Sequence, residues 1–312
     1  MTGTVYKSTG SWYEIKDQTG EMRSCRLKGK IRLEDIQSTN PIAVGDIVDL
    51  ENEEGDYVIS AIHPRKNYMV RESPKHKHAK HIIASNLDQA FILVTIASPR
   101  TSSGFIDRFL LVAEAYAIPV TIVFNKKDLL NAKELKKQEE LEAIYQKIGY
   151  DTLTISCLDS NDIEKVRMKL KGKTTLLSGH SGVGKSTLLN ALNPHLSLRT
   201  GDISSKHDKG THTTTFAEMI EVDDAETLII DTPGIKEFGI MGFEIEEISV
   251  FFPEMKALVN QCQFNNCMHM EEPKCAVKMA VSRGEIDAHR YDNYIKIIED
   301  YKENYKYWER KK

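Results

Sequence analysis

One octapeptide constrains the fold of this chain more than any other feature. Residues 179–186 have the sequence Gly-His-Ser-Gly-Val-Gly-Lys-Ser, which matches the phosphate-binding pattern G-x-x-x-x-G-K-[ST]. Its glycines let backbone N–H groups surround an anion without Cβ clashes, while Lys185 can reach the β- and γ-phosphates and the Ser186 hydroxyl can bind Mg²⁺. An apolar run precedes the loop and an amphipathic stretch follows it, so a chance glycine-rich turn is a poor alternative. The octapeptide therefore predicts a strand, a phosphate-binding loop and a helix.

Two further motifs follow predicted strands and indicate which nucleotide is bound. Asn125-Lys126-Lys127-Asp128 matches the N-K-x-D element of GTPases, whose aspartate accepts hydrogen bonds from guanine, whose lysine covers the base and whose asparagine holds the phosphate loop. Asp231-Thr232-Pro233-Gly234 ends a buried strand, where an aspartate can hold the Mg²⁺ shell and a glycine N–H can bind the γ-phosphate. Ser156-Cys157 fits a short guanine-supporting element. N-K-x-D alone is usually a solvated turn, but the combination predicts GTP. The candidate nucleotide-binding residues are Asn125, Lys126, Lys127, Asp128, Ser156, Cys157, Gly179, His180, Ser181, Gly182, Val183, Gly184, Lys185, Ser186, Thr187, Asp231 and Gly234.

A threonine-rich segment, residues 210–215, lies between these motifs. A threonine here can close over Mg²⁺ and the γ-phosphate when triphosphate is bound, and we favour Thr214, with Thr213 as the alternative. Ile235 stands where Ras-like enzymes place a water-orienting glutamine, so we expect slow intrinsic hydrolysis. His212 could take that role, the alternative being a solvated loop histidine. The candidate catalytic residues are His212, Thr214 (or Thr213) and Lys185, and the candidate Mg²⁺ ligands are Ser186, Thr214 and Asp231.

The order of the motifs is unusual. A typical GTPase begins with the phosphate loop, whereas here the N-K-x-D element and Ser156-Cys157 precede it and Asp231-Thr232-Pro233-Gly234 comes last. Such a rearrangement is tolerated when the original termini lie close together on the surface. The sequence therefore predicts a circularly permuted GTPase domain.

The pattern of apolar and polar residues predicts a multidomain α/β protein. Residues 1–64 contain five short strands and predict an OB-fold barrel that binds RNA, 65–85 a basic linker, 86–260 the GTPase domain, and 261–312 a zinc-binding domain with a C-terminal helix. The alternation over 86–260 is typical of a parallel sheet with helices on both faces. The expected strands are 4–8, 12–16, 22–33, 46–50, 57–62, 90–96, 119–124, 152–156, 174–178, 215–222 and 227–230, and the expected helices of the central domain are 105–117, 131–148 and 160–170.

Cysteines cluster near the C-terminus. Cys262, Cys267, His269 and Cys275 supply three thiolates and one imidazole, a set that Zn²⁺ accepts with tetrahedral geometry. With four ligands the zinc would be structural, one ion per chain. The spacing differs from a double C-x-x-C, so ordinary buried thiols are the alternative.

Basic residues indicate a local RNA-facing surface. Arg26, Lys28, Lys30 and Arg32 alternate with less polar residues, which places four cations on one face of a strand. A merely solvated edge is the alternative. Residues 63–81 add six Lys and Arg against one Glu. The whole chain, with 42 Lys+Arg and 46 Asp+Glu, has a net charge of −4, so any RNA-binding surface must be local.

Composition also indicates the cellular compartment. No apolar run approaches the length of a bilayer span, and five cysteines in 312 residues favour a reducing cytoplasm over a disulfide framework. Nothing in the sequence requires self-association, so we expect a monomer without membrane contact.

The barrel, the permuted GTPase domain and the Cys₃His segment, in this order, resemble the bacterial ribosome small-subunit-dependent GTPase A family (RsgA, also called YjeQ or YloQ). The most specific elements are 125–128 preceding 179–187, the 210–215 segment, and Phe264–His269 with Glu272–Val277. Lys274 departs from a frequent glycine at a position that is not a ligand. The resemblance implies a checkpoint in late 30S subunit assembly, in which binding to 16S rRNA stimulates hydrolysis of GTP to GDP. Hydrolysis then accompanies release of the protein and of an assembly factor. The resemblance also strengthens the zinc prediction.

Two other functions remain open at this point. The chain could be a GTP-dependent RNA-binding module in which hydrolysis is incidental, since Ile235 weakens intrinsic catalysis. A P-loop ATPase or small-molecule kinase is disfavoured by the N-K-x-D element.

Overall fold

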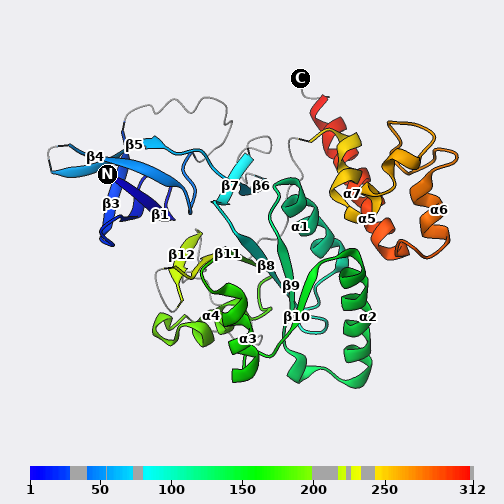
Figure 1. Cartoon of the computed structure of the whole chain (residues 1–312), viewed down its shortest axis with the longest axis horizontal. Coiled ribbons are helices and arrows are strands. Elements are labelled where there is room, and N and C mark those ends of the chain that lie inside the picture. The colour runs from blue at the N-terminus through cyan, green and yellow to red at the C-terminus, as the bar shows by residue number, and fades with distance from the viewer. Residues whose placement is uncertain are drawn as a thin grey trace.

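The structure is a computed structural model with an elongated shape. A barrel at the N-terminal end, a central α/β domain and a C-terminal helical segment follow one another along its length (Figure 1). The residues that it describes are 1–28, 41–53, 55–72, 80–198, 217–222, 226–232 and 243–309.

The N-terminal strands close into a barrel. The order is β1-β2-β3-β5-β4, β4 pairs back to β1, and β3 runs parallel to β5. Alternate side chains point inward and form a separate apolar core that includes Tyr13, Ile15 and Ile59. The OB-fold prediction is confirmed, although β3 ends at Leu27 rather than at residue 33, and residues 29–40 lie outside the described part. The strands are β1 (Thr2–Ser8), β2 (Tyr13–Asp17), β3 (Met22–Leu27), β4 (Ile47–Glu53) and β5 (Asp56–Ile62).

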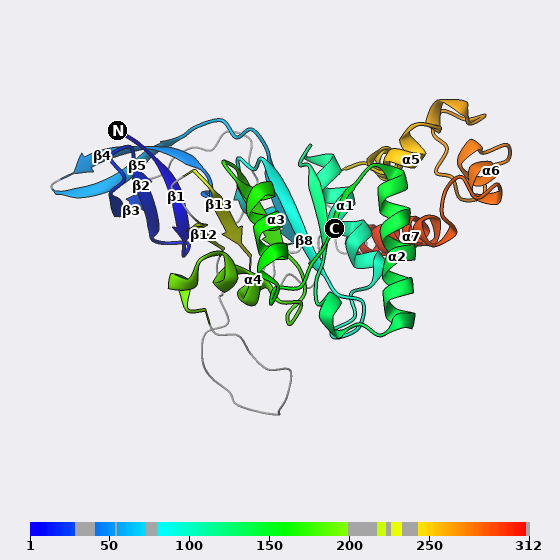
Figure 2. The same ribbon diagram turned by 60° about the horizontal axis from the view of Figure 1, so that its bottom comes forward.

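The central domain is built on a parallel sheet in the order β10-β9-β8-β11-β13, with β12 antiparallel beside β13. Side chains of β8 alternate between two cores: Ile92 joins the core with α1, whereas Phe91 joins the core with α3 and α4. Helices therefore cover both faces, as the sequence predicts (Figure 2). The elements are β8 (Gln89–Val94), α1 (Ser103–Ala115), β9 (Val120–Phe124), η1 (Lys127–Leu129), α2 (Ala132–Ile148), β10 (Asp151–Thr154), α3 (Ser160–Leu170), β11 (Thr174–Ser178), α4 (Lys185–Leu192), η2 (Pro194–Leu196), β12 (Glu218–Glu221) and β13 (Leu228–Asp231).

The expected linker contains regular structure. Strands β6 (Tyr68–Glu72) and β7 (Lys80–Ser85) form an antiparallel pair inside residues 65–85. Met69, Val70 and Ile82 are buried in the core shared with α1. Residues 65–85, expected as a basic linker, thus contain a strand pair, because a few buried apolar side chains outweigh the charged composition around them. The domain boundaries themselves stay a prediction.

Within the described ranges, two sets of contacts join the barrel to the central domain. Strand β1 pairs with β12 at Lys7 and Glu218, which makes one continuous sheet. Around this pair, Lys7 bonds Glu218, and Tyr6 and Lys16 both bond Glu221. The second attachment is buried: Arg65 makes two hydrogen bonds of 2.6 Å to the carboxylate of Asp46, which also accepts from Ser85. Val44, two residues before Asp46, forms an isolated β-bridge with Ala84 of β7.

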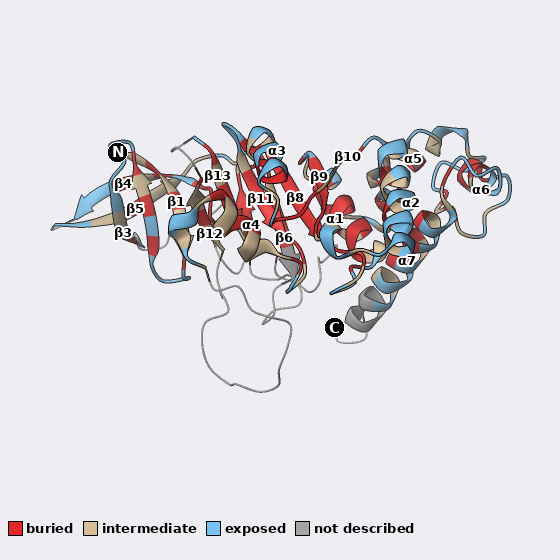
Figure 3. Cartoon of the chain, turned by 90° about the horizontal axis from the view of Figure 1, so that it is seen from below, coloured by how far each residue is buried: buried red, intermediate tan, exposed pale blue. Residues whose placement is uncertain are grey.

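The C-terminal segment packs through its long helix against α1. The side chains of Tyr294 and Ile298 in α7 are buried. Buried residues occur in the barrel, the central sheet and the C-terminal segment (Figure 3). Arg290 lies in the same interface, 3% exposed, and pairs with Asp107 of α1 and Glu254 of α5. No helix within the described ranges is long and apolar enough to cross a membrane. The elements are η3 (Ile245–Phe251), α5 (Pro253–Lys256), η4 (Val259–Gln261), α6 (Ala276–Ser282) and α7 (Ala288–Glu309).

Candidate nucleotide site, metal centre and RNA-facing surface

The predicted phosphate loop connects the end of β11 to the start of α4. Gly179 has φ +148°, and a Cβ there would lie 2.5 Å from the carbonyl oxygen of Leu93. Gly184 has φ +106°, and a Cβ there would lie 2.3 Å from Nδ2 of Asn125. Both positions therefore exclude any side chain, for reasons of backbone conformation and of space.

Two charged side chains face the loop. Lys185 donates from Nζ to the carbonyl oxygens of Gly179 (2.6 Å) and His180 (3.0 Å), and burial lowers its pKa. Asp231 ends β13, and its Oδ1 is buried without a hydrogen-bond partner among the described residues. Burial raises the pKa of Asp231 to about 6. A buried, unpartnered carboxylate oxygen beside a lysine fits a site in which a divalent cation balances phosphate charge.

The N-K-x-D loop is joined to the phosphate loop by direct hydrogen bonds. Asn125 donates from Nδ2 to the carbonyl oxygen of Val183 (2.8 Å), and its Oδ1 accepts from the backbone N–H of Cys157 (3.2 Å). Lys126, in the left-handed region at φ +67°, donates from Nζ to the carbonyl oxygen of Gly182 (2.8 Å). One asparagine thus holds three loops that are far apart in sequence.

Lys127 and Asp128, the last two residues of the N-K-x-D element, have different surroundings. Lys127 pairs with the buried carboxylate of Asp162 (2.5 Å) and so faces the start of α3. Asp162 also accepts from the backbone N–H of Ser156 (2.8 Å), which fixes the Ser156-Cys157 turn. Asp128 lies in the short helix η1.

The loops meet because they follow the carboxyl ends of neighbouring parallel strands. Strands β9, β10, β11 and β13 all run in the same direction, and ligands bind at this edge in open α/β sheets. The remaining predicted site residues, namely His212, Thr213, Thr214 and Gly234, lie outside the described residues.

The four predicted metal ligands come together in the C-terminal segment. Their ligand atoms all lie within 4.8 Å of one another. The Sγ atoms of Cys262 and Cys275 are 4.0 Å apart, and Nδ1 of His269 lies 3.6 Å and 3.3 Å from them. A tetrahedral ion with Zn–S of about 2.3 Å and Zn–N of about 2.0–2.1 Å would place two sulfurs about 3.8 Å apart and sulfur and nitrogen about 3.6 Å apart. The observed separations fit a single tetrahedral metal ion.

The protonation state of this cluster depends on whether a cation is bound. Burial raises the pKa of the Cys267 thiol to about 12, because a thiolate loses its hydration there. A bound dication reverses this preference and keeps the thiolates deprotonated.

Helix α7 supports the ligand loop. Tyr291 donates its hydroxyl to the carbonyl oxygen of His269 (2.6 Å), and Tyr294 donates to that of Met268 (2.7 Å). Lys274, between the predicted ligands His269 and Cys275, adopts φ +52°. This is a left-handed conformation that glycine adopts more readily than lysine.

The predicted basic face of β3 is only partly available for phosphate. Lys28 is exposed but pairs with Glu51 (2.5 Å) and Glu53 (2.8 Å). The guanidinium of Arg26 lies over the indole ring of Trp12, 4.2 Å from its centroid. Lys30 and Arg32 lie outside the described residues.

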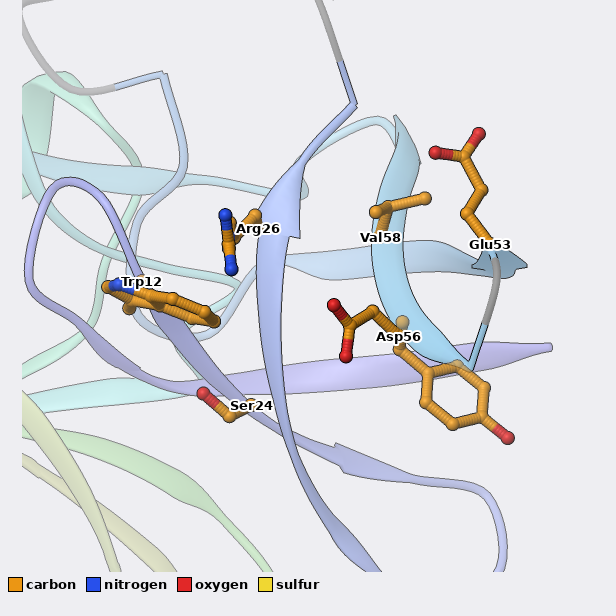
Figure 4. Close-up of a pocket in the computed structure, with 7 residues that line it drawn as sticks. Trp12, Ser24, Arg26, Glu53, Asp56 and Val58 are labelled. Carbon is orange, nitrogen blue, oxygen red and sulfur yellow. The ribbon is translucent and has the colours of Figure 1, made fainter.

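Side chains that the sequence interpretation did not single out accompany Arg26. Trp12, Ser24, Arg26, Glu53, Asp56, Tyr57 and Val58 line a hollow of about 560 Å³ on the barrel (Figure 4). Trp12 is 44% exposed. An exposed tryptophan just before a strand is an available signal, but only the structure shows that Arg26 lies over its ring.

Comparisons with known proteins agree over nearly the whole chain. Residues 62–241 match the model of the RsgA GTPase family, and residues 2–58 match that of the RsgA N-terminal domain. The "Small ribosomal subunit biogenesis GTPase RsgA" of Flavobacterium johnsoniae is 53% identical, with 98% of this chain and 95% of that protein covered. The protein of the same name from Bacteroides fragilis is 49% identical, with 98% and 99% covered.

Solved structures give the same result. YjeQ from Thermotoga maritima is similar with a TM-score of 0.76 and 36% identity, covering 96% of this chain and 97% of that one. YloQ, described as a circularly permuted GTPase, is similar with a TM-score of 0.72 and 29% identity, covering 97% and 95%.

Proposed function

Since this chain belongs to the RsgA GTPase family and is a circularly permuted GTP-hydrolysing enzyme, we propose that it acts in maturation of the small ribosomal subunit. The observation that carries the proposal is the meeting of the phosphate loop and the guanine loops at one sheet edge, next to a barrel joined to the same sheet. The names of the relatives, which are small ribosomal subunit biogenesis GTPases, support this role.

We assign the nucleotide roles from the motifs, and the hydrogen bonds of Asn125 and Lys185 support them. Backbone N–H groups of 179–184 surround the β-phosphate, and Lys185 moves from its backbone carbonyls to the β- and γ-phosphates. Asp128 accepts from guanine, and Asn125 holds its loop against the phosphate loop. The Ser186 hydroxyl, Thr214 and Asp231 would hold Mg²⁺, which offsets the negative charge that develops on the phosphates.

Hydrolysis requires an oriented water molecule. Ile235 cannot orient it, so we assign that role to His212 and expect slow turnover until a partner orders the active site. A His212→Ala protein that binds GTP normally and keeps full stimulated turnover would exclude this assignment.

Cys262, Cys267, His269 and Cys275 would hold one structural zinc ion. Zinc well below one equivalent in protein purified without chelator would count against this identification.

The partner is the small subunit, contacted through 16S rRNA by the barrel. GTP hydrolysis lowers the affinity for the subunit and releases the protein, together with an assembly factor. The protein acts as a monomer in the cytoplasm.

The deciding experiment is a GTPase assay titrated with purified 30S subunits at two salt concentrations. We expect clear stimulation that weakens at the higher salt, because phosphate contacts release counterions. Turnover that does not change with 30S subunits would reject the proposal and favour a GTP-dependent RNA-binding module.

A further inference from the structure

The hollow on the barrel has the composition of a base-binding site. Its lining comes from the β1–β2 connection, β3, the end of β4 and β5, and Figure 4 labels six of the side chains around it. OB-folds hold oligonucleotides in this part of the barrel. Its volume of about 560 Å³ falls within the roughly 300–1,000 Å³ of ligand pockets.

One side of the hollow is a stacking platform. Trp12, directly before β2, and Arg26 of β3 both line it, and the guanidinium carbon (Cζ) of Arg26 lies 4.2 Å from the centroid of the indole ring. A flat cation over an aromatic ring gives a preformed surface on which a nucleobase can stack.

The other side carries carboxylates. Asp56 and Glu53 belong to the lining, so its charged groups are one cation and two anions. Glu53 is already paired with Lys28, whereas no ion pair of Asp56 occurs among the described residues. These carboxylates would repel a phosphate, but they can accept hydrogen bonds from a base edge that carries two donors. Guanine has such an edge, formed by N1–H and the exocyclic amine, and a carboxylate can accept from both.

We propose that this hollow binds one unpaired guanine base of RNA, stacked on Trp12 and Arg26 and hydrogen-bonded by Asp56. The inference rests on the proposed RNA-binding role of the barrel and adds base specificity to it. The phosphates of the bound strand stay outside the hollow.

The test uses the full-length protein saturated with GDP, so that the guanine of the RNA does not enter the nucleotide site. Fluorescence polarisation gives the affinities of the labelled RNA pentamers UUGUU, UUAUU and UUUUU. We expect UUGUU to bind about tenfold more tightly than UUAUU, the size of one good bidentate contact to a base. In a Trp308→Phe background, UUGUU quenches the fluorescence of Trp12.

Three variants locate the contacts. Asp56→Asn removes the preference for guanine, and Trp12→Ala weakens binding of all three RNAs about tenfold by loss of stacking. Glu51→Gln is the matched control, because it removes a barrel carboxylate that pairs with Lys28 outside the hollow. Thermal melting of each variant verifies that it is folded.

Equal affinities for the three RNAs, or a guanine preference that survives Asp56→Asn, would overturn the inference. These outcomes are distinguishable from failure of the proposed function. If 30S subunits stimulate the parent protein but the pentamers bind without preference, only the guanine site is wrong. If 30S subunits do not stimulate it, the ribosomal role fails whatever the pentamers show.

Discussion

Replacing Arg290 with methionine should destabilise the junction between the C-terminal segment and the central domain. The guanidinium is 3% exposed and binds Asp107 (2.6 Å) and Glu254 (2.8 Å), and these carboxylates hold its pKa above the ordinary value against the effect of burial. Asp107 is itself 1% exposed. Without Arg290, two carboxylates remain near each other with no cation between them. Breaking a buried pair in this way costs about 3–5 kcal/mol.

Glu254→Gln is the comparison that isolates charge from packing. Its side chain is 11% exposed, and Arg290 keeps Asp107 as a partner when Glu254 is neutralised. We therefore expect a loss of only about 1 kcal/mol. Methionine retains most of the apolar contact that the arginine stem makes, so the difference between the variants reports the ion pairs.

Hydrogen exchange of α7 and urea unfolding followed by circular dichroism measure these losses. The α7 amides of Arg290→Met should exchange faster than those of α4, because the lost contacts join α7 to α1 and α5. A loss below about 1 kcal/mol for Arg290→Met, or one no larger than that of Glu254→Gln, would refute the reasoning.

Three further predictions concern other parts of the chain. Asp128→Asn should weaken GTP binding about 100-fold, because the charged hydrogen bonds to guanine are lost. It should improve binding of XTP, whose 2-oxo group accepts a hydrogen bond from the amide. Titration with both nucleotides checks this, and an unchanged GTP affinity would contradict it. Lys274→Gly should stabilise the metal-loaded protein by about 1 kcal/mol, because Lys274 is at φ +52°; a lower melting temperature would exclude this. Hydrogen bonds from Thr19 and Arg23 hold the pKa of Asp17 below its ordinary value. Its stabilising effect is therefore complete above about pH 4 and lost as the pH falls towards the folded-state pKa. Urea unfolding at pH 6 and pH 3 should show a smaller acid-induced loss in Asp17→Asn than in the parent, and equal losses would argue against this role.

The sequence predicts the nucleotide loops well because their chemistry imposes residue types. Gly179 and Gly184 have positive φ and are closely approached by Leu93 and Asn125. The glycines of the motif are therefore the residues that the loop geometry requires. The four metal ligands are predictable for a similar reason, since a tetrahedral ion needs four donors within a short stretch.

Features that depend on pairing between distant segments could not be predicted in the same way. Arg26 lies over the ring of Trp12 only because β2, which begins directly after Trp12, pairs with β3, and nothing in either segment alone encodes that register. The same holds for Lys28, whose charge is offset by glutamates of β4. Strands β6 and β7 were not predicted, because the cations around their buried apolar residues dominate the composition of this segment.

The two attachments of the barrel differ in strength, and this difference has a mechanical consequence. The Asp46–Arg65–Ser85 cluster is buried, so opening it would leave charges without hydration and would cost several kcal/mol. The bonds to Glu218 and Glu221 on β12 are partly exposed, and such pairs contribute only about 0–1 kcal/mol each. Opening the β12 edge would break these ion pairs, the hydrogen bond from Tyr6 to Glu221 and the pairing of β1 with β12. Because the buried ion pair costs more to open than the partly exposed ones, we expect the barrel to loosen first at the β12 edge and to stay attached through Asp46 and Arg65.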